Sequence, residues 1–149
     1  MRAVIQRVKD AQVSVEGNIE GKIDNGLLVY IAIGDEDTEK DIEYVVKKIV
    51  NLRIFQDEND KMNLSVKDIQ GEILIISQFT LYGDIRKGRR PNFMKSAEPT
   101  IAKKMYEEFI EKIKSEKLIV QSGVFAADMD VTYTNDGPVT ILLDSEKTF

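Results

Sequence analysis

Glu72-Ile-Leu-Ile-Ile-Ser-Gln-Phe-Thr-Leu-Tyr-Gly-Asp84 is the stretch that decides the fold. Its residues Ile73–Ile76 form an apolar, β-branched run bounded by Gly71 and Gly83. Such a run is too short for a helix and predicts a buried strand. Polar side chains follow at once in Ser77–Thr80, where this strand should emerge from the core. Because sites are often built on rigid elements that end in convergent polar groups, we expect the functional site here.

Length and composition favour one soluble domain that spans residues 1–149. The chain has 149 residues, of which 42% are apolar and 32% charged, enough for a proper core. No run of about 18 apolar residues is present, so we expect no membrane-spanning helix. The first residues, Met1–Arg7, lack the apolar core of a signal peptide. We therefore expect a cytoplasmic protein without a membrane partner.

The absence of Cys and His restricts the chemistry. With neither residue present, there can be no disulfide, thiol nucleophile, Cys/His zinc site or His general base. Catalysis must use hydroxyls, carboxylates, Lys, Tyr, backbone groups or a group of the substrate. The net charge of -5 argues against a protein that coats nucleic acid by charge alone, and we expect no DNA partner.

Hydrophobic periodicity predicts a largely antiparallel, barrel-like sheet with two amphipathic helices, an α/β fold. The expected helices run from the N-cap Thr38 to about Leu52 and from Pro99 to about Lys114. The expected strands cover residues 2–8, 11–15, 21–23, 27–33, 53–55, 64–69, 73–76, 118–121, 124–125, 129–133 and 139–143. Turns are predicted at 9–10, 16–18, 25–26 and 135–138 from their Gly, Asn, Asp and Pro content.

Two interpretations of Ser77-Gln78-Phe79-Thr80 remain open from spacing alone. The segment is either a solvated strand end or a site in which the Thr80 hydroxyl binds or attacks the substrate and Gln78 donates a hydrogen bond. A Thr hydroxyl is a poor nucleophile without an adjacent base. Thr80 is therefore more credible as a positioning hydroxyl.

The other polar clusters also have a structural and a functional interpretation. Arg86-Lys87-Gly88-Arg89-Arg90 is either a solvated basic loop or a phosphate-binding loop, for which Arg is well suited. Asn135-Asp-Gly-Pro138 is a β-turn by composition, and a functional role would need a cis Gly137–Pro138 bond, which is uncommon. Three carboxylates match no calcium-loop spacing, so we expect neither metal nor cofactor; they are Asp128, Asp130 and Asp136.

The combination of these segments resembles the D-aminoacyl-tRNA deacylases of the bacterial and eukaryotic type. Ser77–Leu81 and Asn135–Thr140 are similar to the two signature motifs of that family. Further matching segments lie in the same order over essentially the whole chain; they are 4–8, 13–15, 61–65, 82–84, 87–91 and 123–125, followed by Met129. One position departs from the family, because Ala126 stands where Gly is usual.

The resemblance implies a homodimeric hydrolase that cleaves the ester between a D-amino acid, or mischarged glycine, and tRNA. It implies catalysis by Ser77, Gln78, Phe79 and Thr80, with water attack assisted by the ribose 2′-hydroxyl and oxyanion stabilisation near Phe79. It further implies a cis Gly137–Pro138 pair that enters the partner's pocket and excludes L-residues, with Met129 and Asn135 in substrate binding.

Two other classes remain open. The same architecture occurs as an appended domain of some synthetases, so the chain could be a non-catalytic tRNA-binding module. A structural dimer with a polar pocket and no RNA partner is disfavoured by the basic segment beside the expected site.

Overall fold

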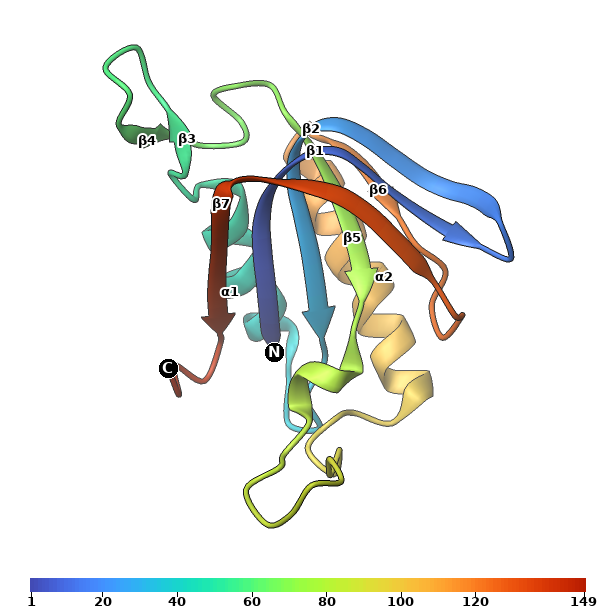
Figure 1. The fold of residues 1–149 in the computed structure, drawn as a ribbon. Coiled ribbons are helices and arrows are strands. Elements are labelled where there is room, and N and C mark those ends of the chain that lie inside the picture. The colour runs from blue at the N-terminus through green and yellow to red at the C-terminus, as the bar shows by residue number, and fades with distance from the viewer.

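A five-stranded sheet with two helices on one side makes up the molecule, as Figure 1 shows. The computed structural model describes all 149 residues. The strand order is β6-β5-β2-β1-β7, and these strands cover Ile119–Ser122, Glu72–Ser77, Asn18–Ala32, Arg2–Val15 and Asp130–Asp144. The helices are α1 (Glu39–Val50) and α2 (Pro99–Ser115). A separate two-stranded ribbon pairs β3 (Phe55–Gln56) with β4 (Met62–Leu64). The predicted fold class is confirmed.

The organising strand is β5, and both of its faces are buried. Ile73 and Ile75 pack into the main core, which also contains the apolar stripes of α1 and α2. Leu74 and Ile76 point the other way, into a second cluster with Val13 and other residues of the curved β1–β2 ribbon. Because successive side chains of a strand alternate between faces, a strand buried on both sides appears as a continuous apolar run.

The sheet is mixed. The long strands β1, β2 and β7 pair antiparallel, whereas β2–β5 and β5–β6 are parallel. The α1 segment connects β2 toward β5, and α2 connects η1 (Phe79–Tyr82), a short 3₁₀ helix, to β6. Parallel neighbours need such crossover connections.

Both helices begin as their sequences predict. The backbone N–H of Thr38 donates to Asp41 Oδ2 at 2.8 Å, a capping interaction at the start of α1. Pro99 occupies the first turn of α2, and Glu98 before it accepts a hydrogen bond from the Thr100 N–H at 3.0 Å.

Three predicted turns are wrong, because the chain continues straight through them. Lys9–Asp10 lies inside β1, where Asp10 has a φ of 51° and the pairing with β7 shifts. Asn25–Gly26 lies inside β2; a Cβ on Gly26 would stand 1.9 Å from the Glu72 carbonyl oxygen, so glycine here permits close approach of β5. Residues 135–138 lie inside β7, and the first reversal of the chain is at Glu16–Gly17.

Two short predicted strands are also absent. Residues 66–70 form turns after β4, and the segment after β6 leaves the sheet at Gly123 and turns at Phe125. The first segment is held by local bonds, such as Ser65 N–H to Asp68 Oδ2 at 2.8 Å, rather than by a neighbouring strand. No helix of the structure combines the length and the apolar character needed to cross a membrane.

Candidate active site

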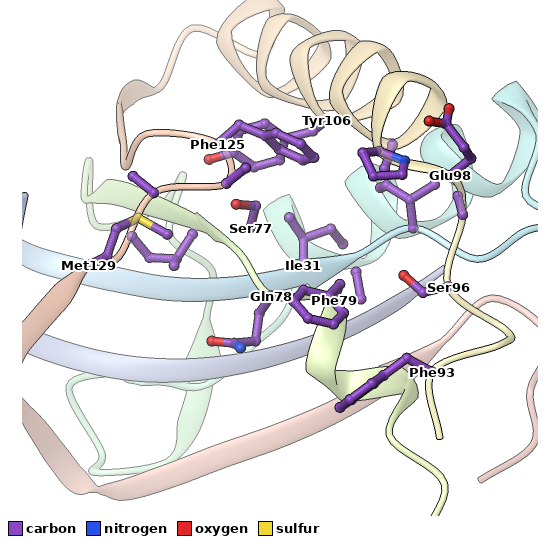
Figure 2. Close-up of a pocket in the computed structure, with 18 of the residues that line it drawn as sticks. Ile31, Ser77, Gln78, Phe79, Phe93, Ser96, Glu98, Tyr106, Phe125 and Met129 are labelled. Atoms are coloured by element: carbon purple, nitrogen blue, oxygen red, sulfur yellow. The ribbon is translucent and has the colours of Figure 1, made fainter. Parts of the chain in front are cut away.

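A cavity of about 690 Å³ opens where β5 ends. It lies between the end of β5, the start of α2 and the segment that follows β6, as Figure 2 shows. Fourteen of its 20 lining residues are hydrophobic, so it suits an apolar group that enters beside a few polar contacts. Tyr106 and Phe125 form one wall, with ring centroids 5.7 Å apart.

The strand end delivers polar groups to this cavity. Ser77 pairs with Ile31 of β2, and both residues line the cavity. The backbone N–H of Gln78 donates to the Ile31 carbonyl at 2.8 Å, so it is not available to a ligand. The next residue, Phe79, is the first of η1, and its backbone N–H therefore has no acceptor within that helix. Of these two backbone donors, the one at Phe79 can therefore serve a substrate oxygen.

Gln78 and Thr80 contact each other directly. The side-chain amide of Gln78 donates to the Thr80 hydroxyl oxygen. Gln78 lines the cavity, whereas Thr80 is exposed and does not. In a single chain the Thr80 hydroxyl thus touches the cavity only through Gln78.

The segment after β6 closes the opposite wall and contains Met129. Its first residue, Gly123, donates its N–H to the Ile75 carbonyl at 3.0 Å. A Cβ on Gly123 would lie 2.5 Å from Met129 Sδ, so a side chain at this position would displace Met129 from its present place in the cavity wall. Ala126, the residue that departs from the family pattern, also lines the cavity and has a φ of 61°. This is the left-handed region, where glycine is more stable than alanine.

Tyr106 is a structural member of the wall. Its hydroxyl donates to the Ile75 carbonyl at 3.0 Å, and burial raises the pKa of the phenol above its ordinary value. The ring therefore stays neutral and fixes α2 against β5.

Four basic side chains lie on an arm that connects η1 to Phe93, a residue of the cavity lining. The arm is a small loop closed by Asp84 and Asn92, whose backbone groups exchange hydrogen bonds of 2.8 and 3.0 Å. Arg86 forms an ion pair of 2.7 Å with Asp84, and these bonds hold the pKa of the Asp84 carboxyl well below its usual range. The remaining cations form no ion pair and are exposed; they are Lys87, Arg89 and Arg90.

The Gly137–Pro138 peptide bond is cis, and the residues around it form a bulge inside β7. In the pairing with β1, Gln6 opposes Thr140 and Val8 opposes Asn135. The single residue Arg7 of β1 therefore lies opposite the four residues 136–139 of β7. The Asn135 side chain stabilises the bulge by accepting a hydrogen bond from the Val139 N–H at 3.0 Å. Gly137 and Pro138 are exposed, and none of these residues lines the cavity of its own chain.

Arg7 lies directly beneath the bulge and is only 7% exposed. Its Nη1 donates to the Ile54 carbonyl at 2.7 Å and its Nε donates to the Asp136 carbonyl at 3.1 Å. A Cβ at position 137 would stand 2.8 Å from Arg7 Nη2, so glycine is required there by contact as well as by its φ of 127°. Arg7 could not be selected from its local pattern, because a charged residue in an alternating strand is ordinary.

The predicted site residues therefore cover the edge of the cavity at the end of β5 and, with Met129, one position of the opposite wall. The structure brings Ser77, Gln78, Phe79 and Met129 together, and places Thr80 and the four basic residues of the arm outside the cavity lining. The missed lining residues come from distant segments and include Phe93, Ser96, Ala97 and Phe125. No cluster of three or more carboxylates is close enough to hold a metal ion.

The sequence and the fold were compared with those of known proteins. The family described as D-Tyr-tRNA(Tyr) deacylase matches residues 4–144. The chain is 62% identical to proteins named D-aminoacyl-tRNA deacylase from Thermosipho africanus and from Halothermothrix orenii, over all of both chains in each case. A solved structure described as c-Myc DNA Unwinding Element Binding Protein is 42% identical with a TM-score of 0.91, covering 97% of this chain and 98% of that one. A second structure, of a probable eukaryotic D-amino acid tRNA deacylase, has a TM-score of 0.80 at 20% identity and covers 95% and 97%, which shows a shared fold.

Proposed function

The chain belongs to the D-Tyr-tRNA(Tyr) deacylase family, and from this premise we propose how its cavity hydrolyses the ester of a D-aminoacyl-tRNA. The enzyme is a hydrolase that acts on aminoacyl-tRNA. The observation that carries the proposal is the junction of an apolar cavity with the polar end of β5. The D-aminoacyl group and the terminal adenosine enter this cavity, and the ester lies beside Ser77 and Phe79.

The chemistry needs no His. The aminoacyl ester is already activated, so a water molecule assisted by the substrate's ribose 2′-hydroxyl attacks the carbonyl carbon. The bond from that carbon to the 3′-oxygen breaks, the 3′-oxygen takes up a proton, and free amino acid and tRNA result. The unpaired N–H of Phe79 stabilises the oxyanion that forms during attack. Gln78 orients the ester, and Thr80 holds the Gln78 amide in place.

The active enzyme is a homodimer in which the Gly137–Pro138 bulge of one subunit enters the cavity of the other. The bulge is exposed, is braced by Arg7 and lies away from the cavity of its own chain. A second copy of the chain therefore supplies the bulge that completes each site. Asn135 keeps the bulge in shape, and Met129 packs at the cavity end that receives it.

Chirality is selected by exclusion. The backbone carbonyls of the bulge capture the α-amino group, and the same backbone occupies the space that an L side chain would need. Glycine has no side chain to exclude, so glycyl-tRNA is also a substrate. Discrimination by backbone has the further consequence that it does not depend on which D side chain is present.

The basic arm holds the phosphates of the tRNA acceptor end. Lys87, Arg89 and Arg90 supply this contact, whereas Arg86 is already engaged by Asp84. On a chain of net charge -5, a local cluster next to the cavity favours a nucleic acid that enters the cavity.

Deacylation of D-tyrosyl-tRNA and L-tyrosyl-tRNA, measured side by side with EDTA present, tests the proposal. We expect loss of the D-ester alone. Loss of neither ester while tRNA still binds would support the alternative, a non-catalytic tRNA-binding module. Loss of both would retain the hydrolase and refute the chiral exclusion.

A further inference from the structure

An aromatic pair lies at the edge of the cavity, and its members are the exposed Phe79 and the half-buried Phe93. Phe79 is 57% exposed although its ring is large and apolar. Its centroid lies 5.1 Å from that of Phe93, with the two rings inclined at 66°. Both rings line the cavity edge, at the end away from Tyr106 and Phe125 in Figure 2. An edge-to-face pair leaves a ring face free for another aromatic group.

The position of the pair is fixed by two different elements. Phe79 is the first residue of η1, directly after the strand end. Phe93 follows Asn92, whose backbone closes the basic arm against Asp84. The Phe93 ring also packs at the position of Gly83, where a Cβ would lie 3.1 Å from its Cε1. A nucleic-acid strand that runs from the basic arm into the cavity would therefore pass over the rings of Phe79 and Phe93.

We propose that Phe79 and Phe93 form a stacking platform for the unpaired base that precedes the terminal adenosine of the tRNA. This inference rests on the proposed function, which places the ester in the cavity and the backbone phosphates on the arm. The nucleotide between these two anchors lies over the aromatic pair. Stacking on aromatic rings is tolerant of sequence, because every base presents a π-face. The platform gives the enzyme affinity for a single-stranded 3′ end without selecting one tRNA over another.

Phe93 provides the clean variants, because it supplies no backbone group to the ester. Phe93→Ala is expected to raise the KM for D-tyrosyl-tRNA about tenfold with little change in kcat, since loss of one base stack typically has this size. Phe93→Trp keeps a stacking surface and is expected to retain the wild-type KM. Met94→Ala is the matched control, because Met94 is 82% exposed and adjacent but does not line the cavity. We expect no change for Met94→Ala.

Two altered substrates locate the base that stacks. The first is D-tyrosyl-tRNA that is abasic at the nucleotide before the terminal adenosine, and the second is the 3′-D-tyrosyl ester of adenosine. Wild type and Phe93→Ala should have the same KM for each, because neither substrate carries the base. Additive effects of the abasic site and Phe93→Ala would overturn the proposal. An equal loss on the adenosine ester would assign the platform to the terminal adenosine and would also overturn it, as would dissociation of the dimer in Phe93→Ala.

A binding measurement keeps this test separate from the proposed function. 2-Aminopurine in place of the same base should be quenched when uncharged tRNA binds wild type, and not when it binds Phe93→Ala. Quenching by an enzyme that hydrolyses no D-ester would refute the proposed function and leave the platform. Hydrolysis of the D-ester with equal quenching by wild type and Phe93→Ala would refute the platform and leave the proposed function.

Discussion

The Nε of Arg7 donates a 3.1 Å hydrogen bond to the carbonyl oxygen of Asp136, the residue directly before the Gly137–Pro138 bulge. The same guanidinium reaches the Ile54 carbonyl at 2.7 Å, so a buried cation ties the bulge to the segment after α1. Arg can make both bonds because its donors form a rigid fork. The exposed bulge thereby has a fixed position, which a backbone that discriminates between enantiomers requires.

Arg7→Met is expected to weaken both the bulge and the chiral filter. Two carbonyls lose their donor, and the free energy of unfolding should fall by about 1–3 kcal/mol. The ratio of D- to L-tyrosyl-tRNA deacylation should also fall, which a purely structural role would not cause. Lys9→Met is the matched control, because Lys9 contacts the Asp136 carboxylate at the surface at 3.2 Å. An Arg7→Met enzyme with an unchanged D/L ratio would remove Arg7 from the account.

Thr80→Ala is expected to leave kcat within about threefold of wild type, because the hydroxyl supports Gln78 and does not attack the ester. Loss of a true nucleophile lowers kcat by several orders of magnitude. Thr80→Ser retains the hydroxyl and serves as the control. Single-turnover deacylation of D-tyrosyl-tRNA gives the rate directly, and a thousandfold loss in Thr80→Ala alone would restore the nucleophile.

The double substitution Arg89→Gln and Arg90→Gln is expected to raise the KM for tRNA and to flatten its salt dependence. Each phosphate contact that is lost should reduce the slope of log affinity against log salt by roughly 0.7–0.9. Arg86→Gln should have a smaller effect, because Arg86 is paired with Asp84. Lys40→Gln with Lys47→Gln, on α1, changes the net charge equally and is the control. An unchanged slope in the Arg89/Arg90 variant would exclude phosphate contact by the arm.

Ala126→Gly is expected to stabilise the protein. A non-glycine residue at a φ of 61° is strained, and relief of this strain exceeds the added entropy of glycine in the unfolded chain. The free energy of unfolding in urea should rise by about 0.5–1 kcal/mol. Ala127→Gly, at the next position and without a positive φ, should lower it. Destabilisation by both changes would mean that the Ala126 methyl group packs usefully against the cavity.

The sequence predicted those elements whose signals are local. The β5 strand was identifiable because four apolar residues bounded by glycines are buried on both faces. Both helices were identifiable from their apolar stripes and from Thr38 and Pro99 at their starts. Ser77 is the last residue of β5 and Gln78 follows it, so a correct prediction of the strand also located this edge of the site.

The rest depends on pairing between distant segments. Asp10 and the segment 135–138 have turn composition, but they are bulges in long strands, because β1 and β7 pair on both sides of them. Gly26 looks like half of a turn and instead makes room for β5. The cavity wall at Phe93 and Phe125 is assembled only when the segments before α2 and after β6 converge on the end of β5.

We expect one subunit to complete the site of the other, and mixed dimers test this dependence most directly. One chain carries Ser77→Phe, which fills the cavity. The other carries Gly137→Ala, whose Cβ would lie 2.8 Å from Arg7 Nη2 and 2.9 Å from Val139 Cγ2. Each homodimer should fail to deacylate D-tyrosyl-tRNA. The mixed dimer should recover about half of the wild-type rate, because one of its two sites pairs an intact cavity with an intact bulge. A mixed dimer as inactive as both homodimers would contradict the account.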